Sequence, residues 1–540
     1  MSYRVAIIAP PYPLEEAPAP PLGVCYVAAA FEAAGCEVRI FDFVVSEYRK
    51  EKLARWMDDF RPNFVGSTSV TMNFPGAADI MMDVKDIDPS VTTVMGGPHV
   101  SFWAPQTLKR YPGIDFIVAG EGEVTISEMV PRLAAGDSLD DVAGLYLRRG
   151  DEIVFTGTRK HLEDLDQLPR PARHLLPISR YQALGFPVSV ITSRGCPNAC
   201  IFCLGRRMVG PKVRYRSPHL VVEEIAHLLD LGFWRINVAD DLFTANKKRV
   251  ATFCSEIERR GLKFGWTAFS RVNTIDEETL VMMKAAGCDC ISFGMESGRQ
   301  EMLNLVKKGI TLDQAREASR LCKKVGIIGH ASYIVGLPGE TPEGLEETDR
   351  VARELGFVYG YHHLSPFPGS TIMDKLEEFD LEILTDDWSQ YDANRPIVKT
   401  SRLTPEMSKA FVDRHHAHCA EEMARIEKGF VDRTNTPEED LLILGNRKLE
   451  TVFAIIDTDL IERFGTLEEN DGDKPDTSLA AVGSRIAAHL GKEQEPVARV
   501  LWDFFKNGYI VLGERNGKKA WVWAPNPAKA WPGVSGKKAV

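Results

Sequence analysis

Three closely spaced cysteines constrain this chain more than any other feature. Cys196, Cys200 and Cys203 follow the pattern C-x3-C-x2-C, in a short loop after the apolar run at residues 186–191. Cysteine thiolates hold iron–sulfur clusters, and a fully ligated cubane normally uses four of them. Three thiolates therefore predict a four-iron four-sulfur cluster in which one iron lacks a protein ligand and is open to a small molecule.

Zinc is one alternative for these cysteines. Structural zinc sites usually pair two C-x2-C halves or add histidines at a set spacing. No histidine lies between Arg194 and Lys212, which disfavours zinc. The other alternative is three ordinary buried cysteines, but their spacing favours the cluster.

The cysteine motif also carries an aromatic residue, Phe202, directly before its last cysteine. In this form it resembles the motif of the radical S-adenosylmethionine (SAM) enzymes, and the resemblance covers residues 186–375. It implies that SAM chelates the open iron and is cleaved by one electron to methionine and a 5′-deoxyadenosyl radical. An electron donor such as flavodoxin or ferredoxin is then an expected partner.

Strand-like and helix-like segments alternate after the cysteine loop, and six such units predict a partial (β/α)6 barrel over residues 186–400. Active-site residues of (β/α) barrels lie at the carboxyl ends of the strands. Ser270, Arg271, Glu296 and Gly336 stand at those ends. By the family resemblance, the first three match SAM contacts and Phe202 packs near the adenine. We include Gly336 in the candidate SAM site.

Each of these assignments has a simpler alternative. Glu296 can form a structural ion pair with Lys307 or Lys308, and Arg271 can be a surface residue. The pair Asp240-Asp241 at another strand end can face the substrate, bind a cation or cap the next helix. We assign no general acid or base, because in such enzymes the cofactors carry the difficult chemistry.

The first part of the chain, residues 1–158, also alternates between apolar strands and helices. A buried run at residues 3–9 opens this pattern, which predicts a doubly wound parallel sheet. Ligands of such sheets bind at the carboxyl ends of the strands. The first turn lacks G-x-G-x-x-G, which disfavours NAD.

Those strand ends carry the ordered set PP, PPLG, GGPH and GEGE. This set resembles the cobalamin-binding domain that is fused to some radical SAM enzymes. The candidate cobalamin residues are Pro11, Gly23, Ser67, Thr68, Thr71, Gly97, His99, Gly120, Glu121 and Gly122. The pattern D-x-H-x-x-G is missing, so we expect no lower cobalt ligand of that kind. His99 either faces the ligand or structures its own loop.

The rest of the chain gives weaker signals. Residues 159–185 are Pro-rich and predict a linker, and residues 401–540 predict a small, mostly helical module. Its order of helix, helix and hairpin is winged-helix-like, and we expect a lid, docking or dimer role. A cluster at His415, His416, His418 and Cys419 is either a metal site or, more simply, a solvated helix face.

Composition narrows the function classes. The 540 residues carry a formal net charge of −11, which argues against nucleic acid as a partner. No apolar run is long enough for an integral membrane segment, and no signal peptide follows Met1. We therefore expect a cytoplasmic protein.

Together these features predict a cobalamin-dependent radical SAM enzyme that methylates an unactivated carbon of a small-molecule or lipid substrate. One alternative is a radical oxidative cyclase or carbon–carbon coupling enzyme, similar to the anaerobic magnesium-protoporphyrin monomethyl ester cyclase. A second alternative is a non-enzymatic cobalamin or redox sensor. The sequence names neither the substrate nor the oligomeric state.

Overall fold

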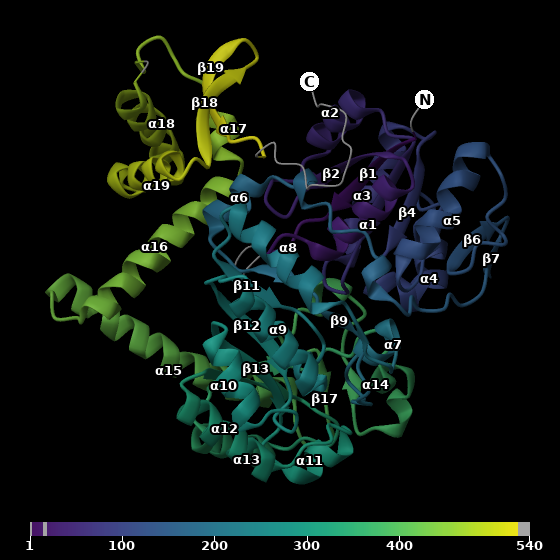
Figure 1. Cartoon of the computed structure of the whole chain (residues 1–540), viewed down its shortest axis with the longest axis vertical. Helices are drawn as coiled ribbons and strands as arrows, with labels where there is room; N and C mark the ends of the chain where they lie inside the picture. Colours follow the sequence, from purple (N-terminus) through teal and green to yellow (C-terminus); the bar gives the residue numbers. More distant parts are fainter. Residues whose placement is uncertain (1–2, 14–18, 473, 527–540) are drawn as a thin grey trace.

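The computed structural model describes residues 3–13, 19–472 and 474–526. An N-terminal α/β unit, a partial barrel and a helical C-terminal region follow one another along the chain (Figure 1). Residues 14–18 of the Pro-rich loop and residues 527–540 of the C-terminal module lie outside the described residues. None of the described helices combines the length and hydropathy that a membrane span requires.

The N-terminal unit is built on a seven-stranded sheet with the order β2-β1-β3-β4-β5-β6-β7. Its first five strands are parallel, which confirms the predicted doubly wound sheet. The strands are β1 (Arg4–Ala9), β2 (Glu37–Asp42), β3 (Phe64–Thr68), β4 (Thr92–Gly96), β5 (Phe116–Val118), β6 (Leu145–Arg149) and β7 (Glu152–Phe155). Because helices cover both faces, β1 is a nearly continuous apolar run.

Two layers of helices sandwich this sheet. One buried core cluster contains residues of α1 (Leu22–Ala33) and α5 (Gly122–Ala135), and another contains those of α2 (Lys50–Phe60), α3 (Phe74–Ile87) and α4 (Pro98–Arg110). The sequence pattern had not indicated α4 or α5. Proline stands inside each of them, and the α4 backbone is kinked at Trp103. Prolines obscure a helical pattern because they normally end one.

One prediction for the following segment needs correction. The strands β6 and β7 form a hairpin, and β6 also pairs antiparallel with β5 and so extends the N-terminal sheet. The linker contains a helix, α6 (Ile178–Leu184), which is too short to show a clear period in the sequence. The domain boundaries at residues 158, 185 and 400 stay predictions.

The second sheet has six parallel strands in the order β15-β14-β13-β12-β11-β8, which confirms the partial barrel. The strands are β8 (Val188–Val190), β11 (Arg235–Val238), β12 (Gly265–Ser270), β13 (Cys288–Glu296), β14 (Ile328–Val335) and β15 (Val358–His363). The helices are α8 (Pro218–Asp230), α9 (Lys247–Arg259), α10 (Glu277–Ala285), α11 (Gln300–Leu305), α12 (Leu312–Val325) and α13 (Pro342–Leu355).

The C-terminal region begins with two long helices, α15 (Pro405–Asp432) and α16 (Pro437–Asp457), that project from the body of the molecule (Figure 1). The predicted order of helix, helix and hairpin follows them. Its elements are α17 (Leu460–Phe464), α18 (Pro475–Leu490), α19 (Gln494–Lys506), β18 (Ile510–Arg515) and β19 (Lys518–Trp523).

The carboxyl ends of the barrel strands pack against the N-terminal unit. Leu337, after β14, and Leu364, after β15, share one buried core cluster with residues of β1, α3 and α4. A Cβ on Gly369 would come within 2.2 Å of the Phe102 ring on α4. The ligand-binding edges predicted for the two sheets therefore lie on either side of one interface.

Candidate functional site

The three cysteines lie in one loop between β9 (Ser193–Arg194) and α7 (Gly205–Val209), and all three are free thiols. Gly205 N–H donates to Cys203 Sγ at 3.4 Å, and Asn198 Nδ2 donates to Cys196 Sγ at 3.4 Å. Hydrogen bonds to sulfur are one of the means by which proteins tune cluster ligands. A loop of three free thiols with its own sulfur donors fits a cluster with three protein ligands.

Contacts before the loop and within it hold it in place. Asp240 is buried and accepts hydrogen bonds from the backbone N–H groups of Thr192 at 2.6 Å and Ser193 at 3.1 Å. Ile201 N–H donates to Val306 O at 3.1 Å. The sequence had suggested substrate contact, cation binding or helix capping for Asp240. In these contacts its carboxylate instead anchors the strand that leads into the cysteine loop.

Three of the five candidate SAM residues surround Lys308. Its Nζ lies 2.6 Å from Glu296 Oε1 and 6.0 Å from the centre of the Phe202 ring. Arg271 donates to the Lys308 carbonyl, and its Nη1 lies 3.7 Å from Cys200 Sγ. Phe202, Arg271 and Glu296 therefore gather beside the cysteine loop, and Arg271 is buried rather than a surface residue.

The other two candidates lie apart from this group in their contacts. Ser270 Oγ hydrogen-bonds Thr244 and, at 3.3 Å, Thr274. Gly336 follows β14 with a φ of 91°, and a Cβ there would meet Val398 Cγ2 at 3.1 Å. Their assignment to SAM stays a prediction.

Glu296 is held in an uncommon conformation. Its φ is 64°, and the register between β13 and β14 shifts between Gly294 and Glu296. A Cβ on Gly294 would lie 2.4 Å from Glu296 Oε1 and 2.7 Å from Lys308 Nζ. A larger residue at this position would displace the ends of both side chains from this arrangement. The ion pair foreseen as a structural alternative is therefore present, and it includes a residue in a backbone conformation of the kind that gathers at functional sites.

Sequence reasoning named Lys308 only as an alternative partner for Glu296. Its side chain is buried, so the charge is costly unless it is paired. A cation beside the cysteine loop can also meet the carboxylate of a ligand. The sequence feature that could have pointed to Lys308 is the run Lys307-Lys308-Gly309. This run follows α11 and has no apolar pattern of its own.

Glu340, in the loop after β14, is a further buried carboxyl group. Burial raises its pKa to about 7, against the opposing effects of the Thr341 N–H and Arg299. Its Oε2 atom has no hydrogen-bond partner among the described residues.

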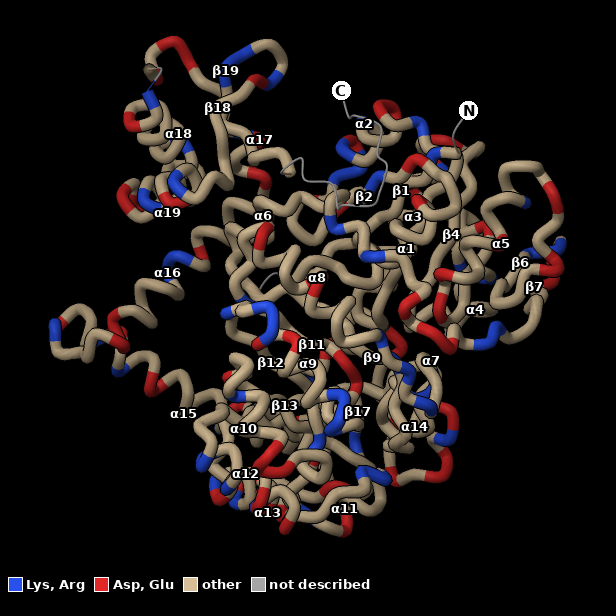
Figure 2. Tube along the Cα trace, viewed as in Figure 1, with Lys and Arg blue, Asp and Glu red and all other residues tan. Residues whose placement is uncertain are grey.

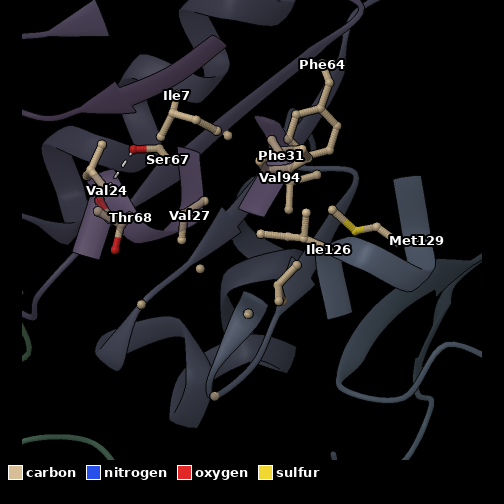
Figure 3. Close-up of a pocket in the computed structure, with 16 residues that line it drawn as sticks. Ile7, Val24, Val27, Phe31, Phe64, Ser67, Thr68, Val94, Ile126 and Met129 are labelled. Atoms are coloured by element: carbon tan, nitrogen blue, oxygen red, sulfur yellow. Dashed lines mark hydrogen bonds between the residues drawn. The ribbon is translucent and has the colours of Figure 1, made fainter. Parts of the chain in front are cut away.

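A cavity lies on one face of the N-terminal sheet (Figure 3). Aliphatic and aromatic side chains form its walls, including Ile7 and Phe64 from the sheet, Phe31 from α1 and Met129 from α5. Five candidate cobalamin residues line it: Ser67, Thr68, Gly97, Gly120 and Gly122. Glycines and hydroxyls beside apolar walls fit a flat apolar group with a polar continuation, so the residues present suit the nucleotide end of a corrinoid.

The other candidates, Pro11, Gly23, Thr71, His99 and Glu121, do not line this cavity. His99 stacks on Phe74 with ring centres 4.0 Å apart, meets Trp388 edge-on at 5.0 Å, and lies 3.3 Å from Thr71 Oγ1 through Nδ1. Burial lowers the pKa of His99 to about 3, so the ring is neutral. It lies in the core on the α3–α4 side of the sheet.

Glu121 contacts the barrel instead. Arg214 Nη1 and Nη2 donate to its two carboxylate oxygens at 2.9 and 2.6 Å. Its neighbours Gly120 and Gly122 line the cavity, but Glu121 itself does not. Its assignment to cobalamin stays a prediction.

The histidine cluster on α15 divides between two environments. His415 packs against Tyr359 and Tyr361, with ring centres 5.1 and 5.0 Å away, whereas His416, His418 and Cys419 are exposed. Among the described residues, no three His, Cys, Asp or Glu side chains are placed to hold a single metal ion. In a cubane, by contrast, each thiolate binds its own iron.

Two family models match the chain: B12 binding domain over residues 16–130, and Radical SAM superfamily over residues 190–352. An uncharacterised methyltransferase of Pyrococcus horikoshii is 35% identical over 390 residues, covering 72% of this chain and 84% of that protein. An anaerobic magnesium-protoporphyrin IX monomethyl ester cyclase of Rubrivivax gelatinosus is 33% identical over 398 residues, 70% of each.

Among solved structures, the cobalamin-dependent S-adenosylmethionine radical enzyme OxsB, with aqua-cobalamin and SAM bound, is similar with a TM-score of 0.66. The match covers 94% of this chain and 79% of that chain at 17% identity. At that identity the likeness shows the fold, and here it extends through nearly all of the chain.

Proposed function

Because the chain belongs to the radical SAM enzymes that carry a B12-binding domain, we propose that it methylates an unactivated carbon of a small molecule or lipid. The cofactors of this family are a four-iron four-sulfur cluster, SAM and cobalamin. When bound, they supply a 5′-deoxyadenosyl radical that removes a hydrogen atom and a methyl group that replaces it.

In this proposal the residues of the chain bind and orient. Cys196, Cys200 and Cys203 hold the cluster and leave one iron open. Lys308 and Arg271 supply positive charge for the SAM carboxylate, and Glu296 accepts from its amino group or ribose. The cavity lined by Gly97, Gly120 and Gly122 takes the nucleotide end of cobalamin.

One observation carries the proposal: the ligand-binding edges of the two sheets face each other. The cysteine loop and the strand ends of the barrel lie against the N-terminal unit whose glycine loops open on the cavity. Transfer between two cofactors requires that both reach one substrate, and positioning of that kind contributes much of the rate in such reactions.

The test is product analysis with anaerobically reconstituted protein, a chemical reductant, SAM and cobalamin. A methyltransferase forms S-adenosylhomocysteine by methylating the reduced cobalamin, and forms 5′-deoxyadenosine by cleaving SAM at the cluster. The Cys203→Ala variant controls for cleavage by free iron. Absence of S-adenosylhomocysteine from protein that has bound all three cofactors would rule out the methylation.

The oxidative cyclase is the second candidate, and the cyclase relative that matches 70% of this chain favours it. A cyclase uses the radical without consuming a methyl group, so it forms 5′-deoxyadenosine alone. The same assay therefore separates the two candidates. We propose a flavodoxin or ferredoxin as the electron donor in either case.

A further inference from the structure

Four charged side chains join the N-terminal unit to the cysteine loop. Glu121 and Glu123 stand in the loop and first turn after β5, and Arg194 and Arg214 stand on the paired strands β9 and β10 (Arg214–Tyr215). We call these four residues the interdomain clamp. Figure 2 shows acidic and basic segments of the chain meeting near β9, between the N-terminal sheet and the barrel.

The contacts within the clamp are direct and mutual. Arg214 donates hydrogen bonds to both carboxylate oxygens of Glu121, at 2.9 and 2.6 Å. Arg194 donates to Glu123 Oε1 at 2.6 Å and lies 3.5 Å from Glu121 Oε1. Bidentate arginine–carboxylate pairs fix orientation as well as distance, so the clamp defines how the two units sit on each other.

The clamp is removed from solvent. The exposed fractions of the four side chains are 11% for Glu121, 9% for Glu123, 12% for Arg194 and 3% for Arg214. Burial alone would raise the pKa of Glu121, but Arg214, Arg194 and His161 outweigh it and lower the pKa. Buried ion pairs add little net stability compared with apolar packing and instead specify geometry in several proteins.

One end of the clamp reaches the cavity. Gly120 and Gly122, on either side of Glu121, both line it. Gly120 N–H also donates to Ser101 Oγ at 2.9 Å, which ties this loop to α4. A ligand that fills the cavity therefore contacts the backbone on both sides of Glu121 and restricts its motion.

The other end reaches the cluster ligands. Arg194 precedes Cys196 by two residues, and Gly195 between them has a φ of 112°. A Cβ on Gly195 would lie 2.2 Å from Lys212 O, and Cys196 N–H donates to Gly210 O at 3.1 Å. The loop is thus seated closely against the segment that leads to Arg214, and it has little freedom to move independently of the clamp.

We propose that the interdomain clamp transmits cobalamin binding to the cysteine loop and sets the spacing between the cobalamin and the cluster. This inference rests on the proposed function and extends it, since it assigns Glu121, Glu123, Arg194 and Arg214 as positioning residues. It also gives the two carboxylates of the GEGE motif a role other than contact with the ligand.

The first test needs no catalysis. Hydroxocobalamin is added to cluster-free protein, and hydrogen–deuterium exchange is followed in peptides around residues 118–126 and 193–203. In the natural protein, cobalamin slows exchange in both peptides. In Glu123→Gln and in Glu121→Gln it slows exchange only in the first peptide, because the loop is no longer tied to the cavity.

Glu163→Gln is the matched control. Glu163 pairs with Lys212, in the same β9–β10 segment, but both partners are more than two-thirds exposed. This variant should behave as the natural protein does. Arg194→Lys keeps the positive charge but loses the planar guanidinium group, so cobalamin should slow exchange of the cysteine loop to an intermediate degree. This variant guards against a result that reflects misfolding alone.

The second test uses the reconstituted holoenzyme. Formation of S-adenosylhomocysteine from reduced cobalamin should fall about tenfold or more in Glu123→Gln, while 5′-deoxyadenosine formation changes by less than about twofold, because only the former needs the two units in register. A merely structural defect would lower both products together.

Three results overturn the proposal. The first is that cobalamin slows exchange of the cysteine loop as much in the variants as in the natural protein. The second is that cobalamin does not slow exchange of that loop in the natural protein. Both leave the proposed function intact. Failure of the protein to bind cobalamin at all would overturn both proposals, and the exchange data would reveal it in the first peptide.

Discussion

The two cofactor regions of this molecule are built from different kinds of side chain. Around the cysteine loop the structure concentrates buried charge, including Arg271, Glu296 and Lys308. The N-terminal cavity has walls of aliphatic and aromatic groups, with glycines and two hydroxyl residues and no charged residue among those that line it. The cluster region is thus suited to select a ligand by charge, and the cavity by shape.

This difference has a physical basis in the ligands. SAM carries a carboxylate and an ammonium group, so complementary charges orient it, and low dielectric strengthens them. A flat nucleotide base offers area rather than charge, and the free energy of burying it grows with the apolar surface removed from water. Substitutions should therefore act differently in the two regions.

The largest effect is expected from the cluster ligands. Cys200→Ala should abolish cluster assembly, because the remaining two cysteines cannot hold a cubane with one open iron. Iron content per chain and 5′-deoxyadenosine formation should both fall to background, while cobalamin binding persists. Cys419→Ser, at an exposed cysteine on α15, is the control. Retention of the cluster in Cys200→Ala would refute the ligand assignment.

The next effect should appear on the cavity side alone. A Cβ on Gly66 would already lie 3.2 Å from both Ile7 Cδ1 and Phe64 Cε1. Gly66→Val fills part of the cavity, and an overpacking penalty of about 1–3 kcal/mol on the bound state corresponds to roughly 5- to 160-fold weaker cobalamin binding. Absorbance titration measures this.

The control for Gly66→Val is Gly76→Ala in α3, where an added Cβ meets nothing within 4 Å. Cluster content should be unchanged in both variants. If Gly66→Val bound cobalamin as tightly as the natural protein, the ligand would not occupy this cavity.

A smaller effect is expected from Glu296→Gln, which keeps the shape of the side chain and removes its charge. Hydrogen bonds to an ionised group are about twice as strong as neutral ones, so SAM should bind roughly tenfold more weakly. Binding is measured by the change that SAM causes in the spectrum of the reduced cluster. Glu301→Gln, at an exposed position in α11, should bind SAM normally, and equal affinity in both variants would remove Glu296 from the site.

The last effect concerns pH, and it acts on folding stability rather than on cofactor binding. The pKa of His99 is about 3 in the folded protein because of burial, below its ordinary value of about 6.5. The unfolded chain therefore binds the proton more readily, and stability is lost as the pH falls from 6.5 toward 3, by up to ~1.4 kcal/mol per pH unit.

His99→Gln should remove that part of the pH dependence, which melting temperatures at pH 5 and pH 7 measure for the cofactor-free protein. His219→Gln, at an exposed histidine, should leave the slope as it is. An unchanged slope in His99→Gln would mean that the ring titrates normally and is not sealed in the core.

The contrast between the two regions also explains what could be predicted. The cysteine motif and the alternation of strands with helices are local patterns, and they indicated both sheets and the cluster loop. Helices α4 and α5 escaped because each contains a proline, and the pairing of β6 with β5 escaped because α5 separates the two strands along the chain.

Among the candidate cobalamin residues, five glycines and small hydroxyls lie together, since topology alone brings such strand ends to one edge, whereas Gly23 and Thr71 lie outside that group. Ser67, Thr68, Gly97, Gly120 and Gly122 do line one cavity. Long or ring-bearing side chains were harder to place, because their reach lets them choose partners in another element. Glu121 reaches the barrel and His99 turns into a core.

The sequence by itself determined the order of the elements, the class of both sheets and the three thiols within eight residues, because each depends on spacing along a short stretch of chain. Only the tertiary structure decided that Glu121 meets Arg214, 93 residues away, that Lys308 lies between Glu296 and Phe202, and that His99 lies against Trp388. Such pairings depend on how two separately folded sheets dock, and no local pattern encodes the docking of surfaces that come together only once both are formed.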